Sequence, residues 1–176
     1  LVKHVKDLSR VVHEAFYVAR SGRPGPVVID LPKDILMGLG QYEDLSKVEH
    51  RTYQPRLKAE TSEIDKAVSM IASAKKPLFY CGGGVINSGP KACRQLDRFV
   101  KLTGAPITLT LMGLGAYPGT DKQFLGMLGM HGTYEANLAM HNADLIIAVG
   151  SRFDDRITGR LDAFAPKSKK IHIDID

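Results

Sequence analysis

The segment Gly150–Arg156 places two arginines and two aspartates within five positions, directly after an apolar run. Guanidinium groups bind phosphate oxygens in a bidentate geometry, and carboxylates accept hydrogen bonds from hydroxyl groups. The preceding run, Leu145–Val149, is apolar throughout and predicts a parallel strand buried on both faces. Because ligands of open α/β sheets bind at the carboxyl ends of strands, this segment predicts a site for a ligand with phosphate and hydroxyl groups.

Further apolar runs also end in small or polar residues. The runs that predict strands at this stage are Pro77–Cys81, Ala105–Leu109 and Lys170–Ile175. They are followed or closed by Gly82–Gly84, Thr110-Leu111 and Asp174. Parallel strands bring all these ends to one edge of the sheet.

The glycines and the acidic residue at this edge indicate a dinucleotide site. Gly82–Gly84 would let the backbone come close to a pyrophosphate, and Asp174 follows Gly150 by 24 positions, near the interval of roughly 20 at which an acidic residue holds a ribose hydroxyl. The triple glycine departs from G-x-G-x-x-G, so the usual NAD fingerprint is absent. The pattern does not name the dinucleotide.

Glycines also surround a histidine upstream of Leu145–Val149. Gly126, Gly129 and Gly132 bracket His131 and predict a tight turn that a ligand could approach. A short helix is expected from Thr133 to His141, with Asn142 as its stop signal.

The remaining elements alternate between helix and strand, which is typical of an α/β fold with a doubly wound, mostly parallel sheet. Asp7 predicts the N-cap of a helix to Arg20, and Val27–Ile29 predicts a strand. Ser62–Asp65 resembles a capping box. The apolar face of that helix is expected to contain Ile64, Ala67, Val68, Ile71 and Ala72. The next helix opens at Ser88-Gly89-Pro90 and closes at Gly104, with Cys93, Leu96, Phe99, Val100 and Leu102 facing inward.

Residues 36–58 show no clear period and predict a linker. We therefore expect residues 1–36 to close one domain, residues 37–58 to link, and residues 59–176 to form a second domain. The chain begins inside what reads as a continuing sequence and ends on a strand, so we expect a fragment.

Composition excludes several classes of protein. The chain has 176 residues, is 44% hydrophobic and 24% charged, and carries a formal charge of +5 with no tryptophan. Its basic residues are scattered, which argues against nucleic-acid binding. Cys81 and Cys93 have no metal-ligand spacing, and no apolar run approaches the roughly 20 residues that span a membrane.

Each feature also has a structural explanation that needs no ligand. Triple glycines often make tight turns, and a single histidine often bonds to backbone. Arg152, Asp154, Asp155 and Arg156 could form a surface ion-pair cluster, and Met112, Met127 and Met130 could fill a core. Their expected placement at one sheet edge favours the functional interpretation.

Several motifs together resemble the catalytic subunit of acetolactate synthase, a thiamine diphosphate enzyme, and the resemblance runs the length of the chain. The motifs are Lys6-Asp7-Leu8, GRPGPV at 22–27, PKD at 32–34, TLMGLG at 110–115, LGMHG at 128–132 and GSRFDDR at 150–156. The resemblance implies the close of a thiamine-pyrimidine-binding domain, a linker, and most of a central domain that carries FAD.

The resemblance also implies which residues contact FAD and which line the substrate or inhibitor channel. The implied FAD contacts are Arg23, Gly83, Thr110, Leu111, Leu128, Gly129, Met130, His131, Gly150, Ser151, Arg152, Phe153, Asp154, Asp174 and Ile175. The implied channel residues are Lys33, Met130, Asp155 and Arg156. Arg23 is supplied by the resemblance alone.

Such an enzyme decarboxylates pyruvate on thiamine diphosphate and condenses the product with a second 2-keto acid, in branched-chain amino acid biosynthesis. The family's catalytic glutamate would lie upstream of Leu1 and its GDG…N motif for magnesium and thiamine diphosphate downstream of Asp176. We therefore expect no catalytic residue and no metal ligand here, and an inactive fragment. The resemblance further implies a cytoplasmic, bacterial-type homodimer or homotetramer with a regulatory small subunit.

Two alternatives remain at this point. One is the central domain of another thiamine enzyme of the pyruvate oxidase or glyoxylate carboligase type, against which RFDDR and PKD argue. The other is a free-standing nucleotide-binding module with no catalytic parent.

Overall fold

The structure is a computed structural model that describes residues 1–42, 44, 50 and 52–176. The chain forms two compact units, one of Leu1–Lys58 with Ile175–Asp176 and one of Ala59–Asp174. The two are considered separately. The assignment of residues 1–36 and 37–58 to a domain end and a linker stays a prediction, and in the linker residues 43, 45–49 and 51 lie outside the described part.

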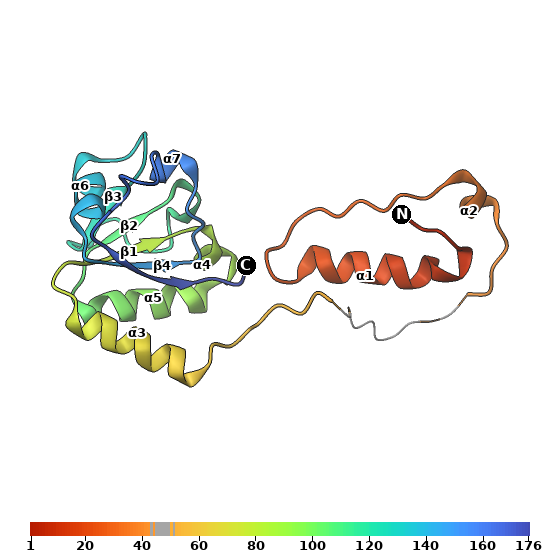
Figure 1. Cartoon of the computed structure of the whole chain (residues 1–176), viewed down its shortest axis with the longest axis horizontal. Coiled ribbons are helices and arrows are strands. Elements are labelled where there is room, and N and C mark those ends of the chain that lie inside the picture. The colour runs from red at the N-terminus through yellow and green to blue at the C-terminus, as the bar shows by residue number, and fades with distance from the viewer. Residues whose placement is uncertain (43, 45–49, 51) are drawn as a thin grey trace. The chain divides into compact units, whose positions relative to one another are not determined.

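The smaller unit contains a 3-10 turn, η1 (Val5–Asp7), and the helices α1 (Leu8–Arg20) and α2 (Lys33–Met37) (Figure 1). The helix expected after Asp7 is confirmed, but the expected cap is wrong. Asp7 has helical backbone angles and makes no capping hydrogen bond, and its carboxylate instead lies 3.3 Å from Arg10.

The strand expected at Val27–Ile29 is also wrong. These residues form no strand pairing, and Val28 is 90% exposed. A parallel strand needs neighbouring strands to bond its backbone, and the described part of this unit holds none.

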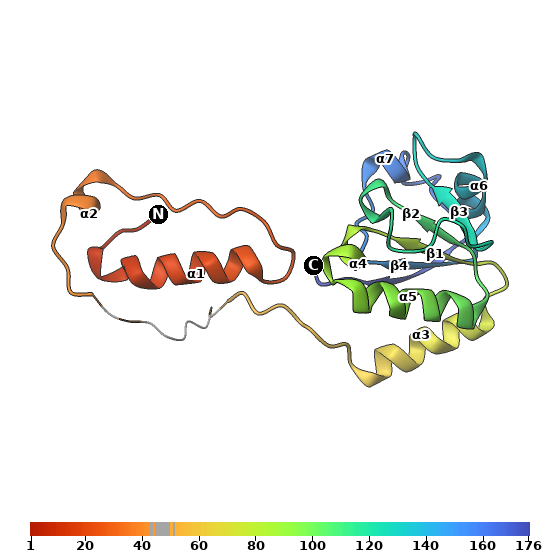
Figure 2. The same cartoon turned by 180° about the vertical axis from the view of Figure 1, so that it is seen from behind.

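The larger unit is a five-stranded sheet with helices on both faces (Figures 1 and 2). Its strands are β1 (Pro77–Cys81), β2 (Ile107–Leu109), β3 (Phe124–Met127), β4 (Leu145–Val149) and β5 (Lys169–Ile173). Its helices are α3 (Thr61–Ser73), α4 (Gly83–Asn87), α5 (Pro90–Thr103), α6 (Tyr134–Asn142) and α7 (Asp155–Thr158), with a 3-10 turn η2 (Leu111–Gly113). All strand pairs are parallel and the order is β3-β2-β1-β4-β5, so the doubly wound α/β fold is confirmed.

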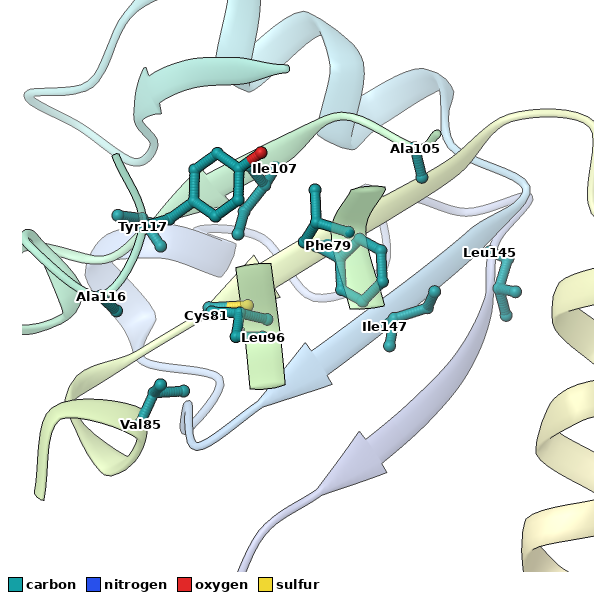
Figure 3. Packing of buried hydrophobic residues seen from close by; sticks show 12 residues of the cluster. Phe79, Cys81, Val85, Leu96, Ala105, Ile107, Ala116, Tyr117, Leu145 and Ile147 are labelled. Atoms are coloured by element: carbon teal, nitrogen blue, oxygen red, sulfur yellow. The ribbon is translucent and has the colours of Figure 1, made fainter. Parts of the chain in front are cut away.

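Alternation along the central strands divides the core into two layers. Phe79 and Cys81 of β1 pack with Leu96 and Val100 of α5 on one face (Figure 3). Tyr80 on the opposite face packs with the layer formed with α6. Successive side chains of a strand point to opposite faces, so one apolar run supplies both layers.

Two helix faces differ from the expectation. Helix α3 begins at Thr61, and its capping box joins Glu60 and Glu63 rather than Ser62 and Asp65. Of the side chains expected to face inward, Ile71 packs against the core and Ala67 is half-buried, whereas Ile64, Val68 and Ala72 are exposed. Met70 and Ala74, which were not expected there, also pack against the core. In α5 the expected inward residue Leu102 is 82% exposed, while Gly104 ends the helix in the left-handed conformation as expected.

Strand β3 was not expected. It forms where the sequence predicts only a glycine-bearing turn, and it is an edge strand whose residues are all half-buried. Thr108 contributes to holding it, because its hydroxyl donates to the carbonyl oxygen of Gly126 at 2.9 Å.

Candidate functional site

The carboxyl ends of the five parallel strands meet at one edge of the sheet, as the sequence predicts for four of them. The residues that follow the strands are Gly82, Thr110, Leu128, Gly150 and Asp174. Strands β2 and β3 continue to one side of β1, whereas β4 and β5 lie on its other side. The order in which strands are added to the sheet thus reverses between β1 and β4, and this chain reversal is the position where open α/β sheets bind ligands.

The glycines at this reversal pack against each other. A Cβ at Gly82 would lie 2.5 Å from the carbonyl oxygen of Gly150, and one at Gly84 would lie 2.7 Å from its Cα. The amide of Gly84 donates to Gly150 at 2.9 Å, and Gly150 has a φ of +56°. The close approach of the two chain segments is by itself enough to require these glycines. They are therefore not independent evidence for a ligand. A Cβ at Gly83 would lie 3.1 Å from Met112.

The loop after β4 is fixed by two side chains that sequence reasoning missed. The hydroxyl of Tyr80 donates to the carbonyl oxygen of Arg152 at 2.8 Å. Nε2 of His172 lies 2.9 Å from the carbonyl oxygen of Ser151. The hydroxyl of Ser151 donates to the carbonyl oxygen of Tyr80 at 3.1 Å. Burial, and secondarily the charge of Asp154, raises the pKa of Tyr80 to about 12, so this donor stays protonated at neutral pH. A tyrosine within an otherwise apolar buried strand was the available signal.

Charges in this loop are arranged around Asp154. Its carboxylate caps α7 by accepting from the amide of Arg156 at 3.1 Å and also pairs with Arg152. The backbone amide of Arg156 and the guanidinium of Arg152 hold the pKa of Asp154 below its usual range. The side chain of Arg152 is 69% exposed, so its guanidinium is accessible to an anion at this edge. Asp155 and Arg156 are exposed on α7.

Phe153 points into the protein rather than toward the edge. Its ring lies 5.4 Å from the rings of both Tyr80 and His172 and 6.2 Å from that of Phe164. Any contact of Phe153 with a ligand would therefore come from its backbone.

The turn 128–132 stands beside α7. Gly129 has a φ of +99°, and the amide of Met130 donates to the carbonyl oxygen of Arg156 at 3.1 Å. Leu128 is buried in the core, whereas His131 is exposed. The turn thus joins two segments that were predicted separately as parts of one site.

Apolar side chains are exposed at the same edge. Leu111 is 67% exposed, Met112 is 77% exposed, and Met130 is 62% exposed. The hydroxyl of Thr110 accepts from the amide of Gly113 at 3.1 Å and so fixes the turn that presents the first two. Exposed apolar side chains of this kind can pack against a flat apolar ring.

Asp174 follows β5, and its carboxylate lies 3.7 Å from Nε2 of His172. The larger unit therefore holds the predicted residues from Gly83 to Asp174 on one sheet edge. Arg23, Lys33 and Ile175 belong to the other unit.

The residues that the structure describes contain no group of three or more His, Cys, Asp or Glu side chains that could hold a metal ion. Among the same residues, no helix combines the length and apolar character needed to cross a membrane.

A hollow of about 520 Å³ lies at the opposite, amino-terminal edge, beside Lys76, Pro77 and Pro106. We place the functional site at the carboxyl edge nonetheless, because the exposed apolar side chains, the accessible guanidinium and the chain reversal coincide only there among the described residues.

Comparisons with known proteins agree with this fold. The chain is 49% identical to the acetolactate synthase large subunit of Haemophilus influenzae and to the acetolactate synthase isozyme 3 large subunit of Escherichia coli, each over the whole chain. It is 48% identical to the chloroplastic acetolactate synthase of Arabidopsis thaliana. The chain spans 31% of the length of the two bacterial relatives and 26% of the plant one. The profile of the thiamine pyrophosphate enzyme central domain matches residues 64–176, and the chain belongs to this family.

Proposed function

We propose that this chain is part of an acetolactate synthase large subunit. The complete enzyme decarboxylates pyruvate on thiamine diphosphate and condenses the product with a second 2-keto acid, for the biosynthesis of branched-chain amino acids. The identity of 47–49% to large subunits over the whole chain supports this assignment.

We further propose that the carboxyl edge of the sheet binds FAD. One observation carries the proposal: exposed apolar side chains and an accessible guanidinium stand together at the chain reversal. FAD combines a flat apolar ring system with an anionic diphosphate and ribose hydroxyls, and the edge offers a partner for each of these parts.

Within this site each group has a proposed role. Arg152 binds the diphosphate, and Asp174 and Ile175 close the adenosine end. Leu111, Met130 and His131 flank the flavin ring. Backbone contacts come from the remaining residues, which are Gly83, Thr110, Leu128, Gly129, Gly150, Ser151, Phe153 and Asp154. Arg23 is a further proposed contact of FAD.

The proposed role of FAD is structural: its binding stabilises the folded protein. A redox role is not needed, because acetolactate formation transfers no electrons to an acceptor. Lys33, Met130, Asp155 and Arg156 are proposed to line the substrate channel. Thiamine diphosphate and Mg²⁺ are proposed to bind residues outside 1–176, and residues 1–176 alone are proposed to be inactive.

The proposed partners and location follow from the resemblance. The complete large subunit is proposed to form a homodimer or homotetramer with a regulatory small subunit. A cytoplasmic location fits the two free cysteines, Cys81 and Cys93.

The test uses the complete polypeptide. Its apoprotein is titrated with FAD by flavin fluorescence, and acetolactate formation from pyruvate is assayed with thiamine diphosphate and Mg²⁺. Arg152→Ala is expected to weaken FAD binding by about tenfold or more, as for the loss of a charge-assisted hydrogen bond. Arg160→Ala is the matched control, since Arg160 is also an exposed arginine paired with an aspartate.

Failure of the wild-type apoprotein to bind FAD would overturn the flavin site. Equal FAD affinity of the two variants would overturn the role of Arg152. Reduction of an electron acceptor by pyruvate, or carboligation of glyoxylate, without acetolactate would favour the alternative thiamine enzymes.

A further inference from the structure

Asn137 on α6 bonds three backbone groups with one side chain. Its Oδ1 accepts from the amide of Gly129 at 2.9 Å, while its Nδ2 donates to the carbonyl oxygens of Gly129 and Thr133, each at 3.0 Å. An asparagine amide has two N–H donors, and both are used here. The N–H and the C=O of Gly129 are therefore both held by the same side chain.

The held residue is the one that gives the turn 128–132 its shape. Gly129 has a φ of +99°, and a Cβ there would lie 2.9 Å from Cδ1 of Ile157. Its carbonyl oxygen also accepts from Gly132 at 2.9 Å, and the next amide, that of Met130, bonds to Arg156. The orientation of Met130 and His131 thus depends on how Gly129 is fixed between α6 and α7.

Local helix structure accounts only for the bond to Thr133, four positions earlier, and not for the two bonds to Gly129. Asparagine is a poor residue for a helix interior, and Asn137 is exposed on its helix, where burial requires no particular residue type. Asn142 on the same helix shows the ordinary arrangement, with a single bond to the carbonyl oxygen of Leu138 at 2.9 Å.

We propose that Asn137 is a positioning residue for flavin binding: it holds Gly129 so that Met130 and His131 face the isoalloxazine ring. The inference rests on the proposed FAD site at this edge. It adds a residue that contacts no part of the cofactor and acts through the turn.

The experiment uses the complete polypeptide with Asn137→Ala and Asn137→Asp, and with Asn142→Ala and Asn142→Asp as matched controls. Each apoprotein is titrated with FAD, the visible spectrum of the bound flavin is recorded, and the melting temperature of the apoprotein is measured. Aspartate keeps the size and the acceptor of asparagine but loses both donors, so it tests the bonds without leaving a gap.

Both Asn137 variants are expected to raise the Kd for FAD by about tenfold and to alter the shape of the flavin's visible band. The Asn142 variants are expected to match the wild type in both. Loss of apoprotein stability alone would not change the spectrum of the flavin that does bind, so the spectrum separates positioning from a merely structural role.

The outcomes separate the two proposals. If Arg152→Ala weakens FAD binding and the Asn137 variants bind FAD with wild-type affinity and spectrum, the inference is overturned and the proposed site stands. The inference is also overturned if Asn137→Asp lowers only the melting temperature. Absence of FAD binding by the wild type would overturn both.

Discussion

The hydroxyl of Tyr80 and the carbonyl oxygen of Arg152 are joined by a hydrogen bond of 2.8 Å across 72 positions of sequence. Tyr80 lies in the central strand β1 and is fully buried, whereas the side chain of Arg152 is largely exposed at the candidate site. A hydrogen-bond donor within the core therefore fixes the backbone of the loop that carries Arg152, the residue proposed to bind phosphate.

Tyr80→Phe in the complete protein is expected to lower the free energy of unfolding by about 1 kcal/mol, the usual net contribution of one hydrogen bond. Amide hydrogen exchange of residues 150–154 should become faster, because their buried anchor is lost. Tyr134→Phe is the control, since Tyr134 is 74% exposed. Unchanged exchange in Tyr80→Phe would show that the bond does not fix the loop.

Gly84→Ala tests the packing of glycines at the chain reversal. The new Cβ would meet the backbone of Gly150 at 2.7 Å, which neither segment can relieve by a side-chain rotation. A loss of about 1–3 kcal/mol in the free energy of unfolding is expected, as for an overpacked core. Gly119→Ala should change little, because the nearest atom to its Cβ is 3.7 Å away on Phe124. Equal stabilities of the two variants would contradict this account.

Stability should fall at alkaline pH through Cys81. Burial raises the pKa of its thiol from 9.0 to about 12, so between these values the unfolded chain loses a proton that the folded chain keeps. The stabilisation is fully present below pH 9 and is lost as pH rises toward 12, by up to about 1.4 kcal/mol per pH unit. Tyr80 acts in the same direction between pH 10 and about 12.

Denaturant unfolding at a series of pH values measures this slope. Cys81→Ala is expected to flatten the fall above pH 9. Cys93→Ala, which removes the other free cysteine, is the control. A slope that is the same in both variants would assign the alkaline loss to other groups.

Arg156→Ala tests the proposed channel. Its backbone amide and carbonyl, which bond Asp154 and Met130, stay in place in the variant, and its side chain is exposed. The melting temperature should therefore change little, while the KM for pyruvate or the affinity for a channel inhibitor changes by several-fold. Arg94→Ala, an exposed arginine on α5, is the control. A large fall in melting temperature with unchanged kinetics would indicate a structural role.

Two strands that are buried on both faces could be predicted to the residue. Pro77–Cys81 and Leu145–Val149 are continuous apolar runs, and the structure places both at the centre of the sheet. Strand β3 could not be recognised because an edge strand with an internal glycine lacks such a run. Val27–Ile29 looked like a strand locally, but strand formation depends on neighbours that a local pattern does not contain.

The candidate site, like the fold, could be predicted only in part. The ends of the strands were predictable because the period and the parallel arrangement determine where the carboxyl edge lies. The anchors Tyr80, Asn137 and His172 were not, since each acts through a hydrogen bond to backbone that is distant in sequence or formed only in the folded turn. The direction of Phe153 into the core was likewise invisible in a segment that is otherwise polar.

The role of the proposed flavin can be separated from its chemistry. Decarboxylation followed by carbon–carbon bond formation moves no electrons to an acceptor, so a redox reaction of FAD is not needed for the net reaction. Binding of FAD to the folded state alone would stabilise it by about 2.7 kcal/mol at a hundredfold excess over Kd.

The proposed complete enzyme is therefore expected to keep most of its carboligase activity when FAD is replaced by a 5-deaza analogue that cannot pass single electrons. Removal of FAD should lower activity and melting temperature together, because both depend on the same folded edge. The measurements are acetolactate formation and thermal unfolding of the wild type with FAD, with the analogue, and with neither. If the analogue restores the melting temperature but not the activity, the flavin takes part in the chemistry, and the carboxyl edge then has a catalytic as well as a binding role.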